Sequence, residues 1–265
     1  MFFNKVKESA DYILSRIDTD IDVAVILGSG LGKITDIMED KRSIPYKEIP
    51  NFPQSSVEGH AGNLIFGKIG NTKVMALQGR FHYYEGFTMK EVAYPVYVMK
   101  LLGIDKMIVT NACGGINEEF KPGDLMIIDD FINSISENPL RGENDERFGP
   151  RFPDMSEPYS KELREHAEKI ADILGIEVKH GVYTFFFFFF YETAAEIRMY
   201  KKAGSDAIGM STVPETIVAN YMGIKTLGIS CITNMATGLR KGYHSHKEVV
   251  AIAEEASKRL CKWME

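Results

Sequence analysis

The chain has 265 residues, of which 45% are hydrophobic and 26% are charged, a composition typical of soluble globular proteins. Its formal net charge of −6 argues against a general nucleic-acid binder and against a basic membrane-binding surface. An anionic ligand would therefore need locally placed positive charge. The three cysteines, Cys113, Cys231 and Cys261, are few and widely spaced, so they predict reduced thiols and no zinc motif.

The ends and the apolar runs of the chain predict no targeting or membrane segment. The N-terminal stretch favours an amphipathic helix over a secretion signal, because its apolar residues recur at helical spacing with charges between them. The longest apolar run, around Phe185 to Tyr191, is far shorter than the roughly 20 residues of a membrane-spanning helix. We therefore expect a cytoplasmic protein without a membrane partner.

Short β-rich runs alternate with amphipathic helical stretches along the chain. The expected strands are Val23–Leu27, Asn63–Ile69, Lys73–Leu77, Lys106–Thr110, Asp124–Asp129, Val178–Thr184, Ala207–Gly209 and Lys225–Ile232. The expected helices are Asn4–Ile17, Met89–Leu102, Lys161–Leu174, Ala194–Ala203, Pro214–Met222 and His246–Met264. This order favours an α/β fold, with helices on the faces of a central sheet that is largely parallel or mixed. No Pro-, Gly- or Ser-rich linker divides the chain, so residues 1–265 are expected to form a single domain.

Two helix starts carry the pattern of a capping box. Thr212 and Glu215 bracket Val213-Pro214, and this spacing predicts reciprocal hydrogen bonds at the start of the following helix. Ser245 and Glu248 form the same pattern before the last helix, which places His246 in its first turn.

The segment QGRFHYYEG, residues 78–86, concentrates functional side chains after an expected buried strand. Arg80 offers an anion-binding fork, His82 a titratable ring and Tyr84 an aromatic surface. Ligands of α/β proteins tend to bind where strands end. A surface loop with a structural arginine is the alternative reading, so the case depends on matching parts elsewhere in the chain.

The first expected strand runs into LGSGLG, residues 27–32. Closely spaced glycines let backbone N–H groups approach a phosphate, and Ser29 adds a hydroxyl. The pattern is neither GxGxxG, because Lys33 stands at the last glycine position, nor a Walker loop, because Ile34 follows Lys33. A tight structural turn is the alternative.

Two further glycine-rich segments are candidates for ligand contact. His60 lies between glycines in VEGHAGN, where a structural or solvated histidine is the more common outcome. TNACGG, residues 110–115, ends an expected strand with small residues that would let a flat ligand lie against the backbone. A plain strand-ending turn explains the second segment equally well.

The segments GMSTVPE and ITNMATG, residues 209–215 and 232–238, are more specific. In the first, Met210 and Ser211 precede a helix whose N-terminal N–H groups carry partial positive charge, which suits a phosphate or a sugar. In the second, Asn234 ends an expected strand. Its amide can donate and accept hydrogen bonds, which suits the edge of a heterocyclic base.

Together these segments resemble the purine nucleoside phosphorylases of the trimeric, low-molecular-mass class. The likeness spans almost the whole chain and is carried by VILGSGLG, NFPQSSVEGHAG, QGRFHYYEG, VTNACGG, PGDLMII, NPLRG, RFPDMS, YETAAEIRM, GMSTVPE, ISCITNMATG and SHKEV. It implies a single α/β domain around a mixed sheet with a distorted barrel, flanked by helices. The implied activity is reversible phosphorolysis of purine ribonucleosides and deoxyribonucleosides to free base and pentose 1-phosphate. It also implies a homotrimer, phosphate as co-substrate, no metal or other cofactor, and no nucleic-acid partner.

The resemblance also implies roles for individual residues. The phosphate-binding residues would be Ser29, His60, Arg80, His82, the backbone of Ala112, and Ser211. The nucleoside-binding residues would be Tyr84, Phe152, Tyr191, Glu192, Met210, Asn234 and His246, with Phe152 reaching into a neighbouring subunit. Asn234, His82 and Glu192 would be the catalytic residues, since Asn234 can donate to N7 as negative charge develops on the leaving purine.

Glu192 with Asn234 matches the pattern for 6-oxopurines, so inosine and guanosine are favoured over adenosine. The alternative within the family is a methylthioadenosine phosphorylase, which usually carries aspartate and an apolar residue at the positions of Asn234 and His246. The run Phe185–Phe190 replaces small residues and a Gly-Pro pair that shape the family's base pocket. It raises a second alternative, an inactive nucleoside-binding relative, because six large rings leave little volume for a base.

Overall fold

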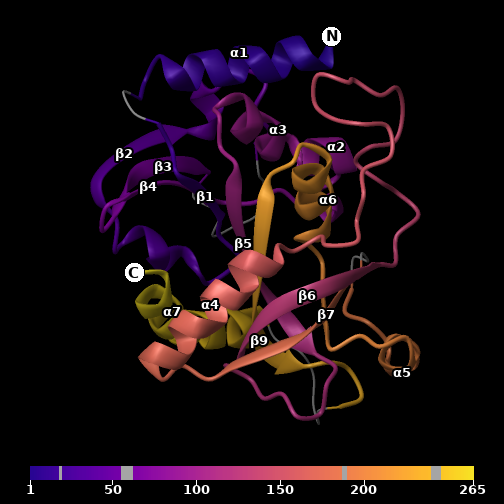
Figure 1. Cartoon of the computed structure of the whole chain (residues 1–265). Coiled ribbons are helices and arrows are strands. Elements are labelled where there is room, and N and C mark those ends of the chain that lie inside the picture. Colours follow the sequence, from indigo (N-terminus) through magenta and orange to yellow (C-terminus); the bar gives the residue numbers. More distant parts are fainter. Residues whose placement is uncertain (18–19, 55–61, 187–189, 240–245) are drawn as a thin grey trace.

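The computed structural model describes residues 1–17, 20–54, 62–186, 190–239 and 246–265 (Figure 1). Within these residues, nine strands form one sheet in the order β2-β3-β4-β1-β5-β8-β7-β6-β9. The strands are β1 Val23–Ile26, β2 Glu39–Pro45, β3 Asn63–Ile69, β4 Thr72–Gln78, β5 Lys106–Gly115, β6 Leu125–Asn133, β7 Val178–Phe185, β8 Ala207–Gly209 and β9 Lys225–Met235. The α-helices are α1 Phe2–Leu14, α2 Met89–Val92, α3 Tyr94–Leu101, α4 Lys161–Leu174, α5 Ala194–Lys202, α6 Val213–Tyr221 and α7 His246–Met264.

Half of the sheet closes on itself. Strand β5 pairs with β8, the order continues through β7 and β6 to β9, and β9 pairs back with β5, so these strands form a ring. The pairs β5/β9, β6/β7 and β7/β8 are parallel, whereas β5/β8 and β6/β9 are antiparallel. Strands β2, β3, β4 and β1 extend from the ring as an open sheet. The predicted single α/β domain with a mixed, barrel-like sheet is confirmed.

Helices cover this sheet in two groups, one above and one below in Figure 1. The first hydrophobic core includes apolar residues of α1, α3 and α6, among them Val6, Val96 and Ile217. The second includes Ala171 of α4 and Leu260 of α7. Burial of these apolar stripes is the main force that orders the amphipathic helices.

Most expected elements agree with the structure. Strands β5 and β6 run past their expected ends to Gly115 and Asn133, so TNACGG lies within a strand and is not a strand-ending turn. The larger differences are at a sheet edge and in one helix. Strand β2 was not expected, because residues 39–43 are exposed and the run EDKRSIP does not alternate between apolar and polar residues. It is an edge strand that pairs only with β3 among the described strands. The single helix expected over Met89–Leu102 is two helices that meet at Ala93, with Pro95 in the first turn of the second.

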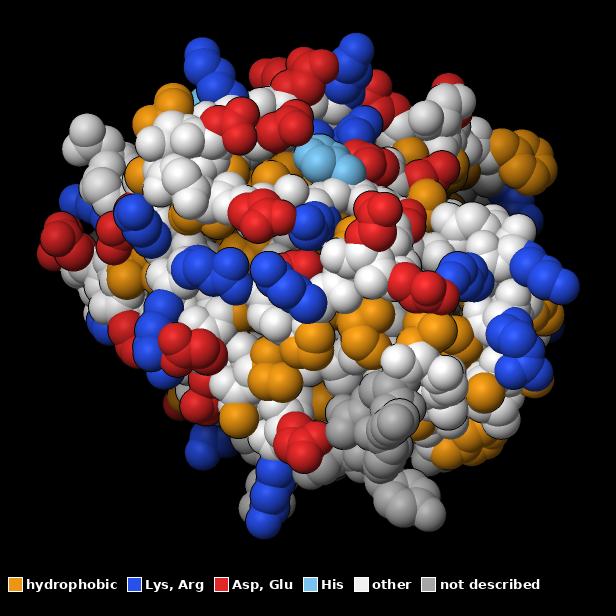
Figure 2. Space-filling model, turned by 90° about the horizontal axis from the view of Figure 1, so that it is seen from below, with side chains coloured by type: hydrophobic (Ala, Val, Ile, Leu, Met, Phe, Trp, Pro, Cys, Tyr) orange, Lys and Arg blue, Asp and Glu red, His pale blue; other side chains and the backbone are white. Residues whose placement is uncertain are grey.

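The described helices agree with the absence of a membrane-spanning segment in the sequence analysis. In the part of the chain that the structure describes, no helix combines the length and apolar character needed to cross a bilayer. On the face seen from below, basic and acidic side chains are interspersed, with hydrophobic side chains between them (Figure 2).

Candidate active site

The predicted site residues meet where parallel strands end. Strands β4, β1, β5 and β9 are parallel neighbours, so their carboxyl ends share one edge of the sheet. A cavity of about 140 Å³ lies at this edge. Its described lining includes Ser29, Arg80, His82, Tyr84, Ala112, Tyr191, Glu192, Met210, Ser211 and Asn234. Segments that are far apart in sequence therefore contribute to one site, as the motifs predicted.

A larger and more open hollow of about 650 Å³ lies elsewhere, between α1 and residues 140–148. Its described lining contains none of the predicted site residues, and acidic and basic side chains alternate around it. We therefore take the smaller cavity at the strand ends as the functional one.

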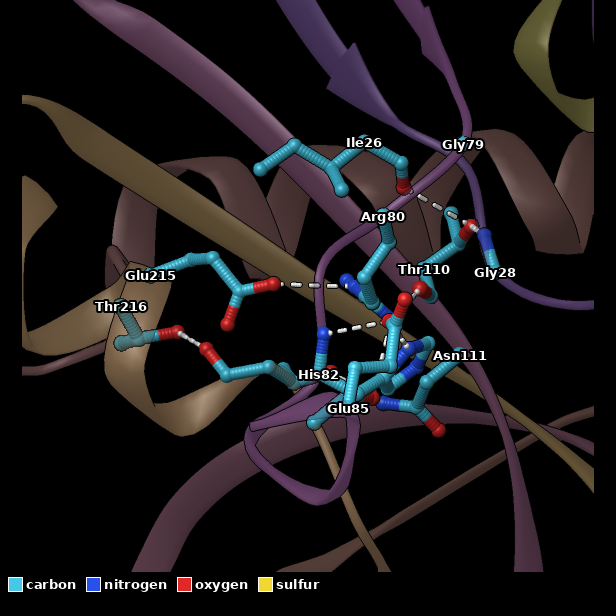
Figure 3. Close-up of polar contacts among 12 residues, drawn as sticks. Ile26, Gly28, Gly79, Arg80, His82, Glu85, Thr110, Asn111, Glu215 and Thr216 are labelled. Carbon is cyan, nitrogen blue, oxygen red and sulfur yellow. Dashed lines mark hydrogen bonds and ion pairs between the residues drawn. The ribbon is translucent and has the colours of Figure 1, made fainter. Parts of the chain in front are cut away.

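Arg80 lines the cavity and is only 3% exposed. Its Nε donates to Oε1 of Glu215 at 2.9 Å, and its Nη1 donates to the carbonyl of Thr110 and to Oγ of Ser211, each at 2.9 Å. Figure 3 shows Arg80 between Glu215 and Thr110. Because the guanidinium is planar and delocalised, these bonds fix both its position and its plane.

The start of helix α6 corrects the predicted capping box. Thr212 stands at the N-cap position, but its side chain makes no cap hydrogen bond to the helix. Its Oγ1 instead accepts from Nδ2 of Asn111 at 2.9 Å, and the carboxylate of Glu215 bonds Arg80. The physical reason is the backbone of Thr212, whose φ of 79° is rare for a β-branched residue and directs the side chain away from the first turn.

The Ser211 hydroxyl lies within hydrogen-bond distance of both Arg80 and Thr212. Thr212 Oγ1 accepts from Asn111, so its own proton can point to Oγ of Ser211, 3.3 Å away. Ser211 Oγ also accepts from Arg80 Nη1. An oxygen that accepts two hydrogen bonds has its own proton left to donate. Ser211 thus has the polarity of a donor toward an anion in the cavity.

His82 is held as a neutral ring. Its Nδ1 lies 3.1 Å from Oε1 of Glu85, and its ring stacks on Tyr84 with centroids 4.6 Å apart. Burial lowers the pKa of His82 below its usual 6.5, and the hydrogen bond to Glu85 opposes this only in part. A carboxylate accepts, so the proton of the neutral ring is on Nδ1 and Nε2 carries a lone pair. Burial also raises the pKa of Tyr84 to about 12, so its hydroxyl keeps its proton.

Two glycines of the loop after β1, Gly28 and Gly30, are packed too tightly for other residues. A Cβ on Gly28 would lie 2.7 Å from Cα of Asn111, and a Cβ on Gly30 would lie 2.6 Å from Cβ of Ala253. Gly30 also has a φ of 75°, which favours glycine. Ser29, between these two glycines, lines the cavity. The backbone N–H of Gly28 donates to Oγ1 of Thr110 at 3.0 Å.

Glu192 and Asn234 lie in the same cavity, and neighbouring groups orient them. Oδ1 of Asn234 accepts from the Thr233 hydroxyl at 3.0 Å, and its Nδ2 donates to the carbonyl of Met235 at 3.3 Å. Oε1 of Glu192 accepts from the backbone N–H of Thr237 at 3.1 Å. Both side chains are largely buried and line the cavity.

The described phenylalanines of the run Phe185–Phe190 lie in different surroundings. Phe185 ends β7 and belongs to the first hydrophobic core, whereas Phe186 lines the cavity and packs edge-on against Tyr200. They are 2% and 1% exposed, and Phe190 is 53% exposed. Residues 187–189 lie outside the described residues. The cavity of about 140 Å³ is smaller than the roughly 300–1,000 Å³ usual for ligand pockets, and Phe186 forms part of its wall.

Three predicted site residues, and Ser245 of the second predicted capping box, are not placed in this cavity. Phe152 is 86% exposed on the segment between β6 and α4, where its described ring contact is with Arg151. His60 and Ser245 lie outside the described residues, as does the side chain of His246.

Sequence reasoning missed the residues that hold the lining in place. Glu85, Thr110 and Glu215 bond residues that line the cavity. Thr233 bonds Asn234 and lines the cavity itself, and Asn111 bonds Thr212, the neighbour of Ser211. Each of these residues lies inside one of the motifs of the sequence analysis, so its position next to a candidate site residue was the signal that could have identified it. For Glu215 the local capping pattern pointed to a different partner, because Arg80 is 135 residues away in the chain.

Comparison with known proteins identifies the family. The model of the Phosphorylase superfamily matches residues 22–265, so the chain belongs to that superfamily. Purine nucleoside phosphorylase 1 of Geobacillus stearothermophilus is 51% identical over 250 residues, which cover 94% of this chain and 91% of that protein. Purine nucleoside phosphorylase 1 of Bacillus subtilis strain 168 is 49% identical over 259 residues, covering 98% and 96%.

Comparison with solved structures supports the same family assignment. The crystal structure of Schistosoma mansoni purine nucleoside phosphorylase in complex with adenosine superposes with a TM-score of 0.94 at 40% identity, covering 98% of this chain and 95% of that one. Within the superfamily, the chain belongs with the purine nucleoside phosphorylases and is an enzyme of that class, a transferase. The resemblance inferred from the motifs is confirmed.

Proposed function

We propose that this enzyme catalyses the reversible phosphorolysis of purine ribonucleosides and deoxyribonucleosides to free base and pentose 1-phosphate. The observation that carries the proposal is a single cavity with two kinds of lining group. Arg80 and Ser211 can donate hydrogen bonds to an anion, and Glu192 and Asn234 can bond the edge of a purine base. A nucleoside that spans these groups has its C1′ between the phosphate and the base. Proximity of this kind accounts for a large share of catalysis in two-substrate reactions.

The chemistry follows from where charge develops. Cleavage of the glycosidic bond builds positive charge on the sugar and negative charge on the purine. Phosphate held by Arg80, Ser211 and Ser29 stabilises the cationic sugar and then attacks C1′. The amide nitrogen of Asn234 donates to N7 of the leaving base, and its orientation by Thr233 supports this role. These contacts strengthen toward the transition state, as catalysis requires.

His82 contributes to the phosphate end in its neutral form. With its proton on Nδ1 and directed at Glu85, the Nε2 lone pair can accept from a protonated phosphate oxygen. The backbone of Ala112 and the side chain of His60 complete the proposed phosphate site, while Tyr84 and Met210 line the ribose.

We further propose that the preferred bases are 6-oxopurines. A carboxylate at Glu192 accepts from N1–H of hypoxanthine or guanine, whereas N1 of adenine carries no hydrogen. Schistosoma purine nucleoside phosphorylases have been solved with hypoxanthine and with adenosine, so binding of an adenine nucleoside has to be measured here. Tyr191 and His246 complete the proposed nucleoside site.

The proposal also covers the co-substrate, the cellular compartment and the oligomeric state of the enzyme. Inorganic phosphate is the co-substrate, and no metal or organic cofactor takes part. The enzyme acts in the cytoplasm, which the three free cysteines support. It assembles as a homotrimer in which Phe152 enters the ribose pocket of a neighbouring subunit, and the high exposure of that ring supports this role.

The deciding experiment follows release of hypoxanthine from inosine by mass-verified protein, with and without inorganic phosphate. We expect turnover that depends on phosphate, with inosine and guanosine used better than adenosine or methylthioadenosine. Better use of methylthioadenosine would favour that alternative activity. Tight nucleoside binding without phosphate-dependent turnover would contradict the proposed phosphorolysis.

A further inference from the structure

Arg80 and Glu215 form an ion pair that is shielded from solvent. Their side chains are 2% and 3% exposed, and Nε of Arg80 donates to Oε1 of Glu215 at 2.9 Å. Glu215 comes from the first turn of α6, and Ser211 lies in the segment immediately before this helix. One short segment therefore supplies two partners of the guanidinium, the carboxylate of Glu215 at Nε and the hydroxyl of Ser211 at Nη1.

The pair restricts the arginine more than a single contact would. Nη1 bonds the carbonyl of Thr110 and the hydroxyl of Ser211, while Nε bonds Glu215 on another edge of the same plane. Because the guanidinium is a rigid fork, rotation about its long axis would break these bonds together. The edge that carries Nε cannot serve a ligand at the same time, so the orientation fixed by Glu215 decides which N–H groups of Arg80 face the cavity.

A helix-capping contact does not explain the burial of Glu215. The predicted cap contact with Thr212 is not formed, and the Thr212 hydroxyl bonds Asn111. Burying a carboxylate is costly unless it is paired with a charge and hydrogen-bonded. The partner here is the arginine at the proposed phosphate site.

We propose that Glu215 is a positioning residue for phosphate binding: it holds Arg80 in its phosphate-binding orientation before phosphate arrives. This role rests on the proposed phosphorolysis. Without Glu215, a buried Arg80 would lose its anionic partner and turn toward other acceptors, and phosphate would have to reorder it on binding. Preorganisation of this kind raises affinity by removing an ordering cost.

The test uses Glu215→Gln, because positioning and simple charge neutralisation predict opposite signs. If Glu215 only offset the charge of Arg80, the variant would gain net positive charge and bind phosphate more tightly. If Glu215 positions Arg80, loss of the charge-assisted bond weakens phosphate binding. We expect the Kd for inorganic phosphate, measured by calorimetry, and the KM for phosphate to rise about tenfold, with the KM for inosine changed less than about twofold.

Two further variants separate positioning from general loss of structure. Tyr159→Phe removes a buried hydroxyl that contacts Thr216 of α6, at 3.3 Å, without touching Arg80, and should leave the KM for phosphate unchanged. Arg80→Lys removes the fork, so adding Glu215→Gln to it should raise the KM for phosphate little further, a non-additivity that reports coupling through Arg80. If Glu215→Gln fails to fold, Glu215→Asp, which retains the charge but withdraws the oxygens by one methylene, carries the same expectation.

The outcomes keep the two proposals apart. A wild-type enzyme that binds phosphate, together with a folded Glu215→Gln variant of equal or higher phosphate affinity, overturns the positioning role alone. A wild-type enzyme that neither binds inorganic phosphate nor requires it for turnover overturns the proposed function and this role with it.

Discussion

The amide of Asn111 on β5 donates to the hydroxyl of Thr212 at 2.9 Å, which ties the sheet to the start of α6. Both side chains are buried, and the backbone of Thr212 has a positive φ that a β-branched residue rarely adopts. The cavity-lining residue Ser211 lies immediately before this position. Strain at Thr212 is thus maintained by a contact that also orients a proposed phosphate ligand.

Replacing Thr212 by valine tests this contact. Valine keeps the shape but removes the hydroxyl, so the buried Asn111 amide loses an acceptor at a cost of about 1–3 kcal/mol. The Ser211 hydroxyl also loses its neighbour, and we expect severalfold weaker phosphate binding. Urea unfolding and the KM for phosphate measure the two effects, with Thr212→Ser as the control that retains the hydroxyl. Equal phosphate KM values for the two variants would contradict the proposed orientation of Ser211.

Asn234→Ala tests the base end of the site. Removing a donor aimed at developing negative charge typically lowers kcat by about 10²–10³-fold, and we expect that loss with inosine while the KM for phosphate changes little. Asn220→Ala, on α6 and outside the described lining of the cavity, is the matched control for loss of a partly buried asparagine. Unchanged inosine turnover in Asn234→Ala would show that the base-site assignment is wrong.

Phe185 and Phe186 form a natural matched pair, since both are buried and adjacent but Phe186 lines the cavity and Phe185 does not appear in its described lining. Truncation of either to valine removes core contacts and should destabilise the fold by about 1–3 kcal/mol. Only Phe186→Val should enlarge the cavity, so we expect it alone to lower the KM for inosine. Steady-state kinetics with thermal melts of both variants measure this. A lower inosine KM in Phe185→Val, or none in Phe186→Val, would mean that the ring of Phe186 does not limit the pocket.

The lowered pKa of His82 predicts a pH dependence of stability. Burial keeps the ring neutral in the folded enzyme, whereas the unfolded chain protonates it as the pH falls through 6.5. The unfolded state then binds more protons, so the free energy of unfolding falls on acidification below about pH 6.5 and levels off below the folded-state pKa. The slope from one histidine cannot exceed about 1.4 kcal/mol per pH unit.

Urea unfolding of the wild type and of His82→Gln between pH 5 and pH 8 measures that slope. The variant should lose less stability on acidification than the wild type. His166→Gln, which removes an exposed imidazole of α4, controls for loss of a histidine. Parallel curves for the wild type and His82→Gln would exclude His82 as a source of acid sensitivity.

Phe152→Ala tests the proposed assembly. The ring is 86% exposed in the subunit, so its removal should change the melting temperature little. If it enters a neighbouring ribose pocket, the KM for inosine should rise several-fold while sedimentation still reports a trimer. A fully active monomer, or an unchanged inosine KM in a trimeric variant, would refute this arrangement.

Much of the fold and of the cavity lining could be predicted from local sequence. The alternation of apolar runs and amphipathic helices predicted the α/β class, because each element has to bury an apolar face. Glycine-bracketed motifs at strand ends predicted Ser29, Arg80, Ser211 and Asn234 as neighbours, because parallel strands bring their carboxyl ends to one edge. The exposed edge strand β2 was missed, since a charged strand on a sheet edge carries no periodic signal.

The sequence by itself determined which residue types gather around the cavity, because its motifs carry both the strand ends and the side chains that follow them. Only the tertiary structure decided how those side chains are paired. Glu215 was expected to cap its own helix from spacing alone, yet it bonds an arginine 135 residues away. A hydrogen bond depends on distance and direction in space, and sequence spacing predicts these only between near neighbours. For the same reason, the sequence could not tell that Phe185 packs in the core while Phe186 lines the cavity.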